Sequence, residues 1–279
     1  MASLSQARVA RFTSRWLTDE LNNFARSGNW EGALQTFEQL QQSSLVHRNV
    51  YHYTTVLKAC SRAGQMDAAM TVFRQMKANQ VKPNVYTYTT LLNGCAVAKK
   101  IDLALRLFAE MRLAEVPPNV RTMTALVTAC ARCGKWEKAF RVLDQCEELL
   151  IAPNVLTYTA AMDGCRRAGV CAPAIALLES KMTDPSQVRP NEVTYNTLLG
   201  ACTAAKDYEA AQRVFARMVA DGYEPIEYTR GLLADVFRGT PLDGLADNIP
   251  VRVKPPKWEA YVPDSDPVTA MRATQEEAS

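Results

Sequence analysis

The chain has 279 residues, of which 48% are hydrophobic and 22% charged, and its formal net charge is only +3. These values are ordinary for a folded protein and lie far from the strongly basic composition of a general nucleic-acid binder. No apolar run approaches the ~18–20 residues that cross a bilayer, so we expect no membrane contact.

The first segment, 1–13, is expected to be an N-terminal extension. Residues 1–18 contain Arg8, Arg11, Arg15 and several serines, and the chain has no acidic residue before Asp19. This composition is typical of organelle transit peptides. The segment is short, and its latter part can equally be interpreted as the start of the first helix.

Residues 14–239 repeat with a period of about 35 residues. The units are 14–49, 50–84, 85–119, 120–154, 155–191, 192–226 and a partial unit at 227–239. One cysteine falls eleven residues into each of five units, namely Cys60, Cys95, Cys130, Cys165 and Cys202. A fixed period of this length indicates a solenoid, in which each unit buries its apolar face against its neighbours. Cysteines at equivalent positions fit small buried residues in a reducing compartment better than disulfide partners.

Each unit is predicted to fold as two helices, which makes the chain an all-α solenoid of helix-turn-helix repeats. In the unit 50–84 we expect helices at Tyr53–Ala63 and Met66–Ala78, with Gly64 in the turn. Lys99 and Lys206 replace this glycine in two units. The turn there either avoids positive φ or costs about 1 kcal/mol.

The last segment, 240–279, is predicted to be a Pro-rich, acidic and partly disordered tail, whose first half Trp258 and Tyr261 could anchor. It carries a net charge of −3 (four basic and seven acidic residues), which leaves +6 on residues 1–239. It is also too short for a catalytic domain and lacks the signature of zinc deaminases.

Catalysis is not expected anywhere in the chain. The two histidines, His47 and His52, have no cysteine or carboxylate pattern around them. Cys130 and Cys133 have CxxC spacing but no second pair to complete a metal site. We therefore predict no enzyme activity, metal, cofactor or small-molecule substrate.

The units resemble the pentatricopeptide repeat over about residues 14–226. The resemblance is carried by the Thr-Tyr opening, the Ala-Cys and Ala-Gly positions of the helices and the Pro-Asn ending, as in Val85–Thr90 and Pro118-Asn119. It implies a right-handed superhelix that binds single-stranded RNA, with one base read by two or three side chains of each repeat.

In that family the fifth and the last residue of a unit jointly select the base. The pairs here are Thr54 with Asn84, Thr89 with Asn119, Thr124 with Asn154, Thr159 with Asn191, and Asn196 with Ile226. The resemblance implies adenine for a Thr–Asn pair and a weakly specified pyrimidine for the last pair. RNA parallel to the chain then gives a 5′-A-A-A-A-Y-3′ site, which Thr18 and Asn49 could extend by one 5′ adenine.

Two further rows of residues fit a nucleic-acid face. The second residue of each unit, which sandwiches the base in the family, is Tyr51, Tyr86, Arg121, Leu156 or Val193. Planar and apolar groups such as these pack on bases. A basic row near the end of the first helix, predicted to contact phosphate, contains Arg62, Arg132 and Arg167, and Val97 and Ala204 interrupt it. Structural roles explain the same residues, because Asn and Thr cap helices and Arg complements the helix dipole.

Two functions remain open. One is an adaptor that binds an A-rich transcript and serves RNA stabilisation, processing or translation in a chloroplast or mitochondrion, the compartments that the resemblance implies. The other is a non-catalytic scaffold of an organellar ribosome or another assembly, which holds protein or structured RNA. With few phosphate contacts we expect weak, salt-sensitive binding, so a protein partner or self-association is one way to reach useful occupancy.

Overall fold

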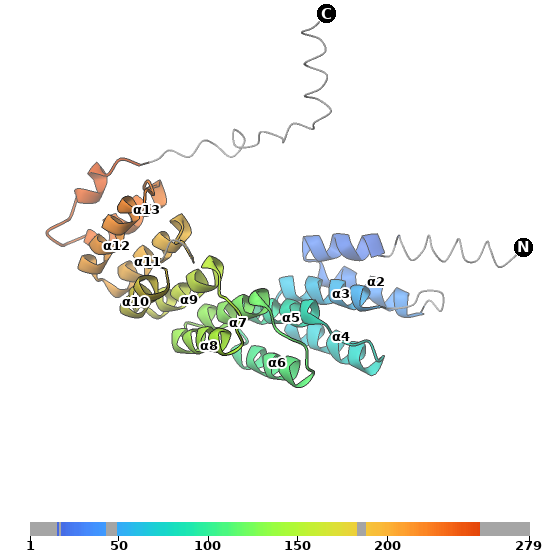
Figure 1. Ribbon diagram of the computed structural model, residues 1–279. Helices are drawn as coiled ribbons and strands as arrows, with labels where there is room; N and C mark the ends of the chain where they lie inside the picture. Colours follow the sequence, from blue (N-terminus) through green and yellow to red (C-terminus); the bar gives the residue numbers. More distant parts are fainter. Residues whose placement is uncertain (1–15, 17, 43–48, 183–187, 252–279) are drawn as a thin grey trace, which may run out of the picture.

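A computed structural model describes residues 16, 18–42, 49–182 and 188–251, and these are helices joined by short turns, with no strand among them. The helices follow one another along an arc, with α2 and α13 at its opposite ends (Figure 1). The first helices of the units after the first are α3 (Val50–Arg62), α5 (Val85–Ala98), α7 (Val120–Arg132), α9 (Val155–Ala168), α11 (Glu192–Ala205) and α13 (Glu227–Phe237). The second helices are α2 (Trp30–Gln42), α4 (Met66–Ala78), α6 (Ile101–Leu113), α8 (Trp136–Glu148), α10 (Ala172–Lys181) and α12 (Tyr208–Ala220). The predicted all-α solenoid is confirmed.

The helices form two layers. Each first helix packs against the first helices before and after it, whereas each second helix packs on its own first helix and on the next one. The row of cysteines lies fully buried between the layers, from Cys60 to Cys202. Burial raises the pKa of the Cys60 thiol to about 11 and that of Cys95 to about 12, so these side chains remain neutral packing groups.

The asparagine that ends a unit starts the next helix. Asn49 precedes α3, and its side chain accepts hydrogen bonds from the backbone N–H groups of Tyr51 and His52. The helix therefore begins at Val50, three residues before the predicted Tyr53, because the cap satisfies N–H groups that have no partner within the helix. The predicted second helix, Met66–Ala78, coincides with α4.

The turns between the two helices of a unit are left-handed. Gly64 has φ 71°, and Lys99 and Lys206 adopt the same conformation with φ 54° and 56°. Both lysines therefore take the costly alternative, in which a side chain occupies a conformation that favours glycine.

The C-terminal end of the array is covered by a short 3₁₀ helix, η1 (Leu245–Asn248), which packs on α13. Ala246 is buried, and Leu242 and Ile249 also contact the core. These residues belong to the segment assigned to the tail, and they add apolar contacts at the C-terminal end of the core. Segment 1–13, Trp258 and Tyr261 lie outside the described residues. No described helix is long and apolar enough to cross a membrane.

Candidate nucleic-acid interface

Two adjoining cavities run along the inner face, which is formed by the first helices. The smaller, of about 410 Å³, lies over α3 and the start of α5, and the larger, of about 770 Å³, continues over α5, α7 and the start of α9. Lys58 and Tyr86 line both cavities. We call these two cavities the inner groove.

The inner groove brings together the residues predicted to act on a base in three successive units. The smaller cavity contains Tyr51, Thr54, Asn84 and Tyr86. The larger contains the next two sets, which are Tyr86, Thr89, Asn119, Arg121, Thr124, Asn154 and Leu156. Residues up to 35 positions apart in sequence therefore line the same groove. They are the second, fifth and last residues of the units, and they come together because each repeat adds one pair of helices to the stack.

The second residues of the units form an exposed row on the inner face. Tyr51, Tyr86, Leu156 and Val193 are exposed by 51%, 52%, 63% and 62%. Tyr51 also donates a hydrogen bond to Asn22 Oδ1 at 2.9 Å, which fixes its ring. Tyr228, exposed by 59%, continues the row in the partial unit 227–239. It was missed in the sequence, although it is the second residue of that unit and the period points to it.

Each paired asparagine has its carbonyl oxygen occupied within the protein. Asn119 Oδ1 accepts from the backbone N–H of Thr122 at 3.0 Å and from the Thr122 hydroxyl at 3.1 Å. The same two bonds recur at Asn84, Asn154 and Asn191. Because a backbone N–H must meet the oxygen, the orientation of the amide is fixed. The amide NH₂ is left as a hydrogen-bond donor.

Each paired threonine donates its only hydroxyl proton to another group of the protein. Thr89 Oγ1 lies 2.9 Å from Thr122 Oγ1, and the Thr122 proton already points to Asn119, so Thr89 is the donor of this bond. Thr159 has the same arrangement with Thr194. Thr54 instead donates to the carbonyl of Val50 at 2.9 Å.

Thr124 Oγ1 lies 2.7 Å from both the carbonyl oxygen of Val120 and Thr157 Oγ1, and its single proton can be donated to only one of them at a time. A threonine in this position can therefore offer only its lone pairs to a ligand. Each Thr–Asn pair thus presents one acceptor, the threonine hydroxyl oxygen, beside one donor, the asparagine NH₂ group. The side chains of Thr89, Thr124 and Thr159 are half-buried, whereas Thr54 is only 4% exposed.

In the unit 192–226 the fifth residue has the opposite hydrogen-bonding polarity. Thr229 has no asparagine before it, and its hydroxyl donates to Asn196 Oδ1 at 2.8 Å. Asn196 is thereby left with its amide NH₂ as a donor, and Ile226 has no polar side-chain group. Asn196 is 8% exposed, so little of it is accessible.

The predicted phosphate row is not uniform. Arg62 donates from Nη1 to the carbonyls of Ala25 and Arg26, at 3.0 and 3.1 Å, and so caps the helix at residues 18–27. Arg167 pairs with Asp163, with 2.7 Å between Nε and Oδ2. Arg132 is exposed and forms no hydrogen bond or ion pair with a described residue.

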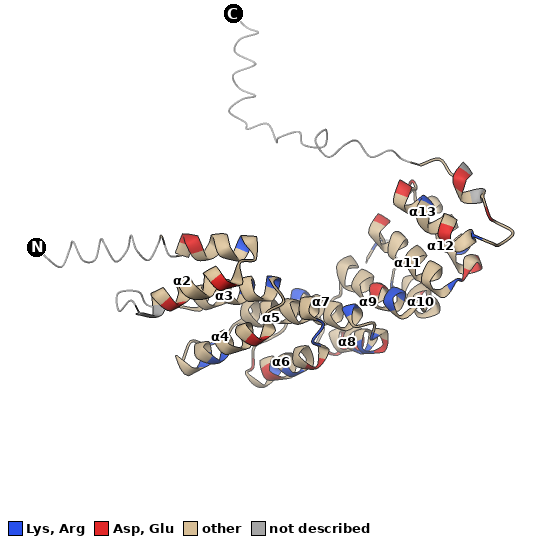
Figure 2. Cartoon of the chain, turned by 180° about the vertical axis from the view of Figure 1, so that it is seen from behind, with Lys and Arg blue, Asp and Glu red and all other residues tan. Residues whose placement is uncertain are grey.

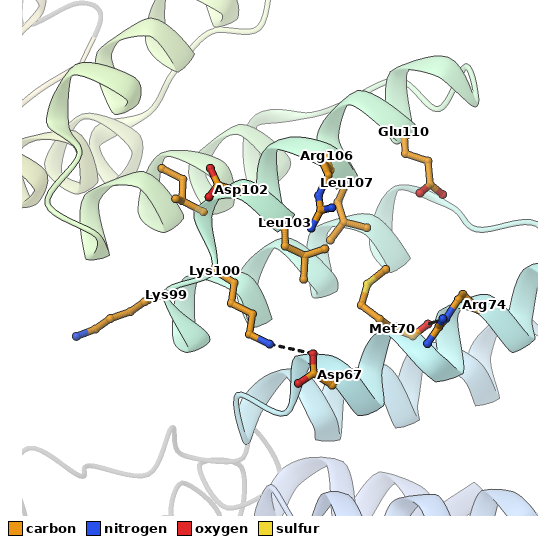
Figure 3. A pocket seen from close by; sticks show the side chains of 11 residues that line it. Asp67, Met70, Arg74, Lys99, Lys100, Asp102, Leu103, Arg106, Leu107 and Glu110 are labelled. Carbon is orange, nitrogen blue, oxygen red and sulfur yellow. Dashed lines mark hydrogen bonds and ion pairs between the residues drawn. The ribbon is translucent and has the colours of Figure 1, made fainter.

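A third hollow, of about 650 Å³, lies on the outer surface between α4 and α6. Its apolar base includes Met70 and Leu107, and Lys100 bonds to Asp67 across its edge at 2.9 Å (Figure 3). It contains none of the residues predicted to bind a base. Within the described ranges, no cluster of His, Cys, Asp and Glu could hold a metal.

Residues 6–169 match the model of the pentacotripeptide-repeat region of PRORP, and residues 190–237 match a PPR repeat family. No curated protein gives a match.

Among solved structures, the pentatricopeptide repeat protein PPR10 from maize is similar, with 27% identity, a TM-score of 0.65, and coverage of 78% of this chain and 31% of that one. PPR10 in complex with an 18-nt psaJ RNA element gives 23% identity, a TM-score of 0.58, and coverage of 83% and 38%. The PPR domain of Arabidopsis thaliana protein-only RNase P 1 in complex with tRNA gives 22%, 0.54, and coverage of 66% and 95%. The chain thus spans about a third of the length of PPR10.

Proposed function

Because the chain belongs to the pentatricopeptide-repeat family, we propose that its inner groove binds single-stranded RNA and reads about one base per unit. The support is the coincidence in one groove of exposed stacking side chains with paired polar groups of fixed polarity. Similar solved structures of PPR10 and of the RNase P 1 domain contain RNA.

The observation that carries the preferred base is the acceptor–donor polarity of the Thr–Asn pairs. Adenine presents an amino donor beside a ring-nitrogen acceptor. Thr89 would accept from that amino group while the Asn119 amide donates to the ring nitrogen. Guanine offers two acceptors, N7 and O6, on the corresponding edge and would leave a threonine lone pair facing O6.

The proposed site is 5′-A-A-A-A-Y-3′. The four Thr–Asn pairs would read the adenines, and Asn196, with only an amide donor, would meet a carbonyl oxygen of a pyrimidine. We expect this last base to be weakly specified, because Ile226 adds no hydrogen bond.

The cellular role that fits is an adaptor without catalysis, which protects an A-rich organellar transcript or helps its processing or translation. Imaging of a fluorescent fusion in plant cells tests the location, and signal confined to the cytosol would contradict it. A scaffold role is the second candidate, because internal contacts of Arg62 and Arg167 leave few inner-face cations for phosphate.

An RNA selection tests base reading. The double variant Thr89→Asn with Asn119→Asp exchanges donor and acceptor in one unit, while the aspartate oxygen still caps α7. We expect the parent protein to enrich A-tracts and the variant to prefer U at one position.

Thr71→Asn on α4 is the matched control and should leave the selected sequences unchanged. Absence of A-tract enrichment by the parent protein, or of a shift towards U in the double variant, would reject base reading and favour the scaffold role.

A further inference from the structure

Lys58 occupies the junction of the two cavities of the inner groove. It lies on α3 one helical turn after Thr54, and it lines both the smaller and the larger cavity. Its side chain is half-buried and forms no hydrogen bond or ion pair with a described residue. An ammonium group held in a groove without a protein counter-charge is well placed for an anionic ligand.

The neighbouring cation of α3 is not available in the same way. Arg62 lies one turn further along, but both of its bonds to the carbonyls of Ala25 and Arg26 hold it against the preceding helix. These contacts favour a role in capping that helix. In this unit the predicted phosphate contact of Arg62 therefore competes with internal bonds, whereas Lys58 has none to break.

The position of Lys58 is occupied by a cation in no other unit. The ninth residues of the units are Asn22, Lys58, Asn93, Thr128, Asp163 and Gly200. Asp163 even reverses the charge and pairs with Arg166 and Arg167. Lys58 is therefore the one cation among these six ninth residues.

We infer that Lys58 binds the phosphate that joins the nucleotide read by Thr54 and Asn84 to the nucleotide read by Thr89 and Asn119. The inference rests on the proposed RNA binding. Two bases in adjoining cavities are linked by one phosphodiester, which must pass the shared boundary that Lys58 and Tyr86 form.

The salt dependence of binding tests this contact. Affinities of Lys58→Gln and the parent protein for labelled oligo(A) and oligo(U) are measured by fluorescence anisotropy across a series of salt concentrations. One lost phosphate contact should reduce the slope of log K against log [salt] by ~0.7, and by the same amount for both RNAs. Lys82→Gln, which removes an exposed lysine outside the groove, should leave the slope unchanged.

A gain-of-contact variant guards against misfolding of Lys58→Gln. Asn93→Lys places a cation at the ninth position of the next unit and should steepen the slope by ~0.7. An unchanged slope in Lys58→Gln, with A-preference intact in the parent protein, would overturn the role of Lys58 alone. Failure of the parent protein to bind either RNA at low salt would overturn RNA binding and this contact together.

Discussion

At the scale of single residues, helix capping and the proposed reading of a base are compatible for the asparagine that ends a unit. The oxygen of Asn119 caps α7 while its NH₂ group remains free for a ligand. The side chain can thus cap the helix with its oxygen and, under the proposed function, donate to a base from its nitrogen. Its sequence position reveals the pair, but the polarity of each group follows from hydrogen bonds to Thr122 that depend on side-chain rotamers.

Variants of Asn119 should separate the two roles. Asn119→Ala is expected to lower the free energy of unfolding by about 1 kcal/mol through loss of the cap, whereas Asn119→Asp should largely keep it. Both should lose adenine preference in that unit, because neither retains the NH₂ donor. Denaturant unfolding and RNA binding are measured on the same samples.

Asp207→Ala provides the control, since Asp207 caps the outer helix α12 through the N–H of Ala210. It should cost similar stability without altering base preference. Equal loss of adenine preference in this variant would show that destabilisation alone explains the effect.

His52 introduces a pH dependence at the N-terminal end. Burial lowers its pKa from the ordinary value of 6.5, and its Nδ1 accepts from the backbone N–H of Asn49. The neutral ring is therefore the folded form. The contribution of the neutral ring to the free energy of unfolding is complete above about pH 6.5, and it is lost as the pH falls through the lower pKa of the folded state.

We expect the unfolding midpoint of the parent protein to fall between about pH 7 and pH 5 more steeply than that of His52→Thr. Threonine is the residue at this position in other units, such as Thr87 and Thr122, and it does not titrate in this range. The variant retains His47, so identical pH profiles would exclude His52 as the titrating group.

At the scale of elements, the sequence predicts the second helix of the unit 50–84 well, because periodic apolar residues determine it. It places the start of α3 three residues late, because the Asn49 cap rather than the apolar periodicity determines where this helix begins. It leaves the φ of Lys99 open, because a lysine in a turn is compatible with either conformation. The period of the repeat does not predict polar contacts between units, such as the hydrogen bond from Arg62 to the carbonyl of Ala25.

The left-handed lysines can be tested by substitution. Lys99→Gly should raise the free energy of unfolding by about 0.5–1 kcal/mol, because glycine adopts φ 54° without the steric cost of a side chain. Lys135→Gly is the control, since Lys135 precedes α8 with φ −96°. It should destabilise through chain entropy, and stabilisation in both variants would contradict the argument. Chemical denaturation measures each change.

At the scale of the whole molecule, charge is divided between the layers. α4, α6 and α8 carry many acidic and basic side chains, whereas α5 on the inner face carries none (Figure 2). Ion pairs such as Lys77 with Glu110 and Lys138 with Asp102 join neighbouring units on the outer face. The inner face is thus left with few charges, and we expect modest RNA affinity that depends on stacking as much as on phosphate contacts.

The covered end of the array predicts the effect of truncation. A chain ending at residue 251 retains η1, which packs on α13, whereas one ending at 239 loses the apolar contacts of Leu242, Ala246 and Ile249 with the core. Loss of these apolar contacts should cost a few kcal/mol and lower the thermal midpoint of the shorter chain relative to the longer one. Equal midpoints would mean that η1 does not contribute to the stability of the array.

The bonds between Thr89 and Thr122 and between Thr159 and Thr194 cross from one unit into the next. The hydroxyl proposed to meet a base is therefore oriented by the third residue of the following unit. For protein engineering, an exchangeable cassette should extend past the Pro-Asn junction to include that third residue. A graft cut at the junction would transfer the fifth and last residues of a unit but not the threonine that orients the fifth residue.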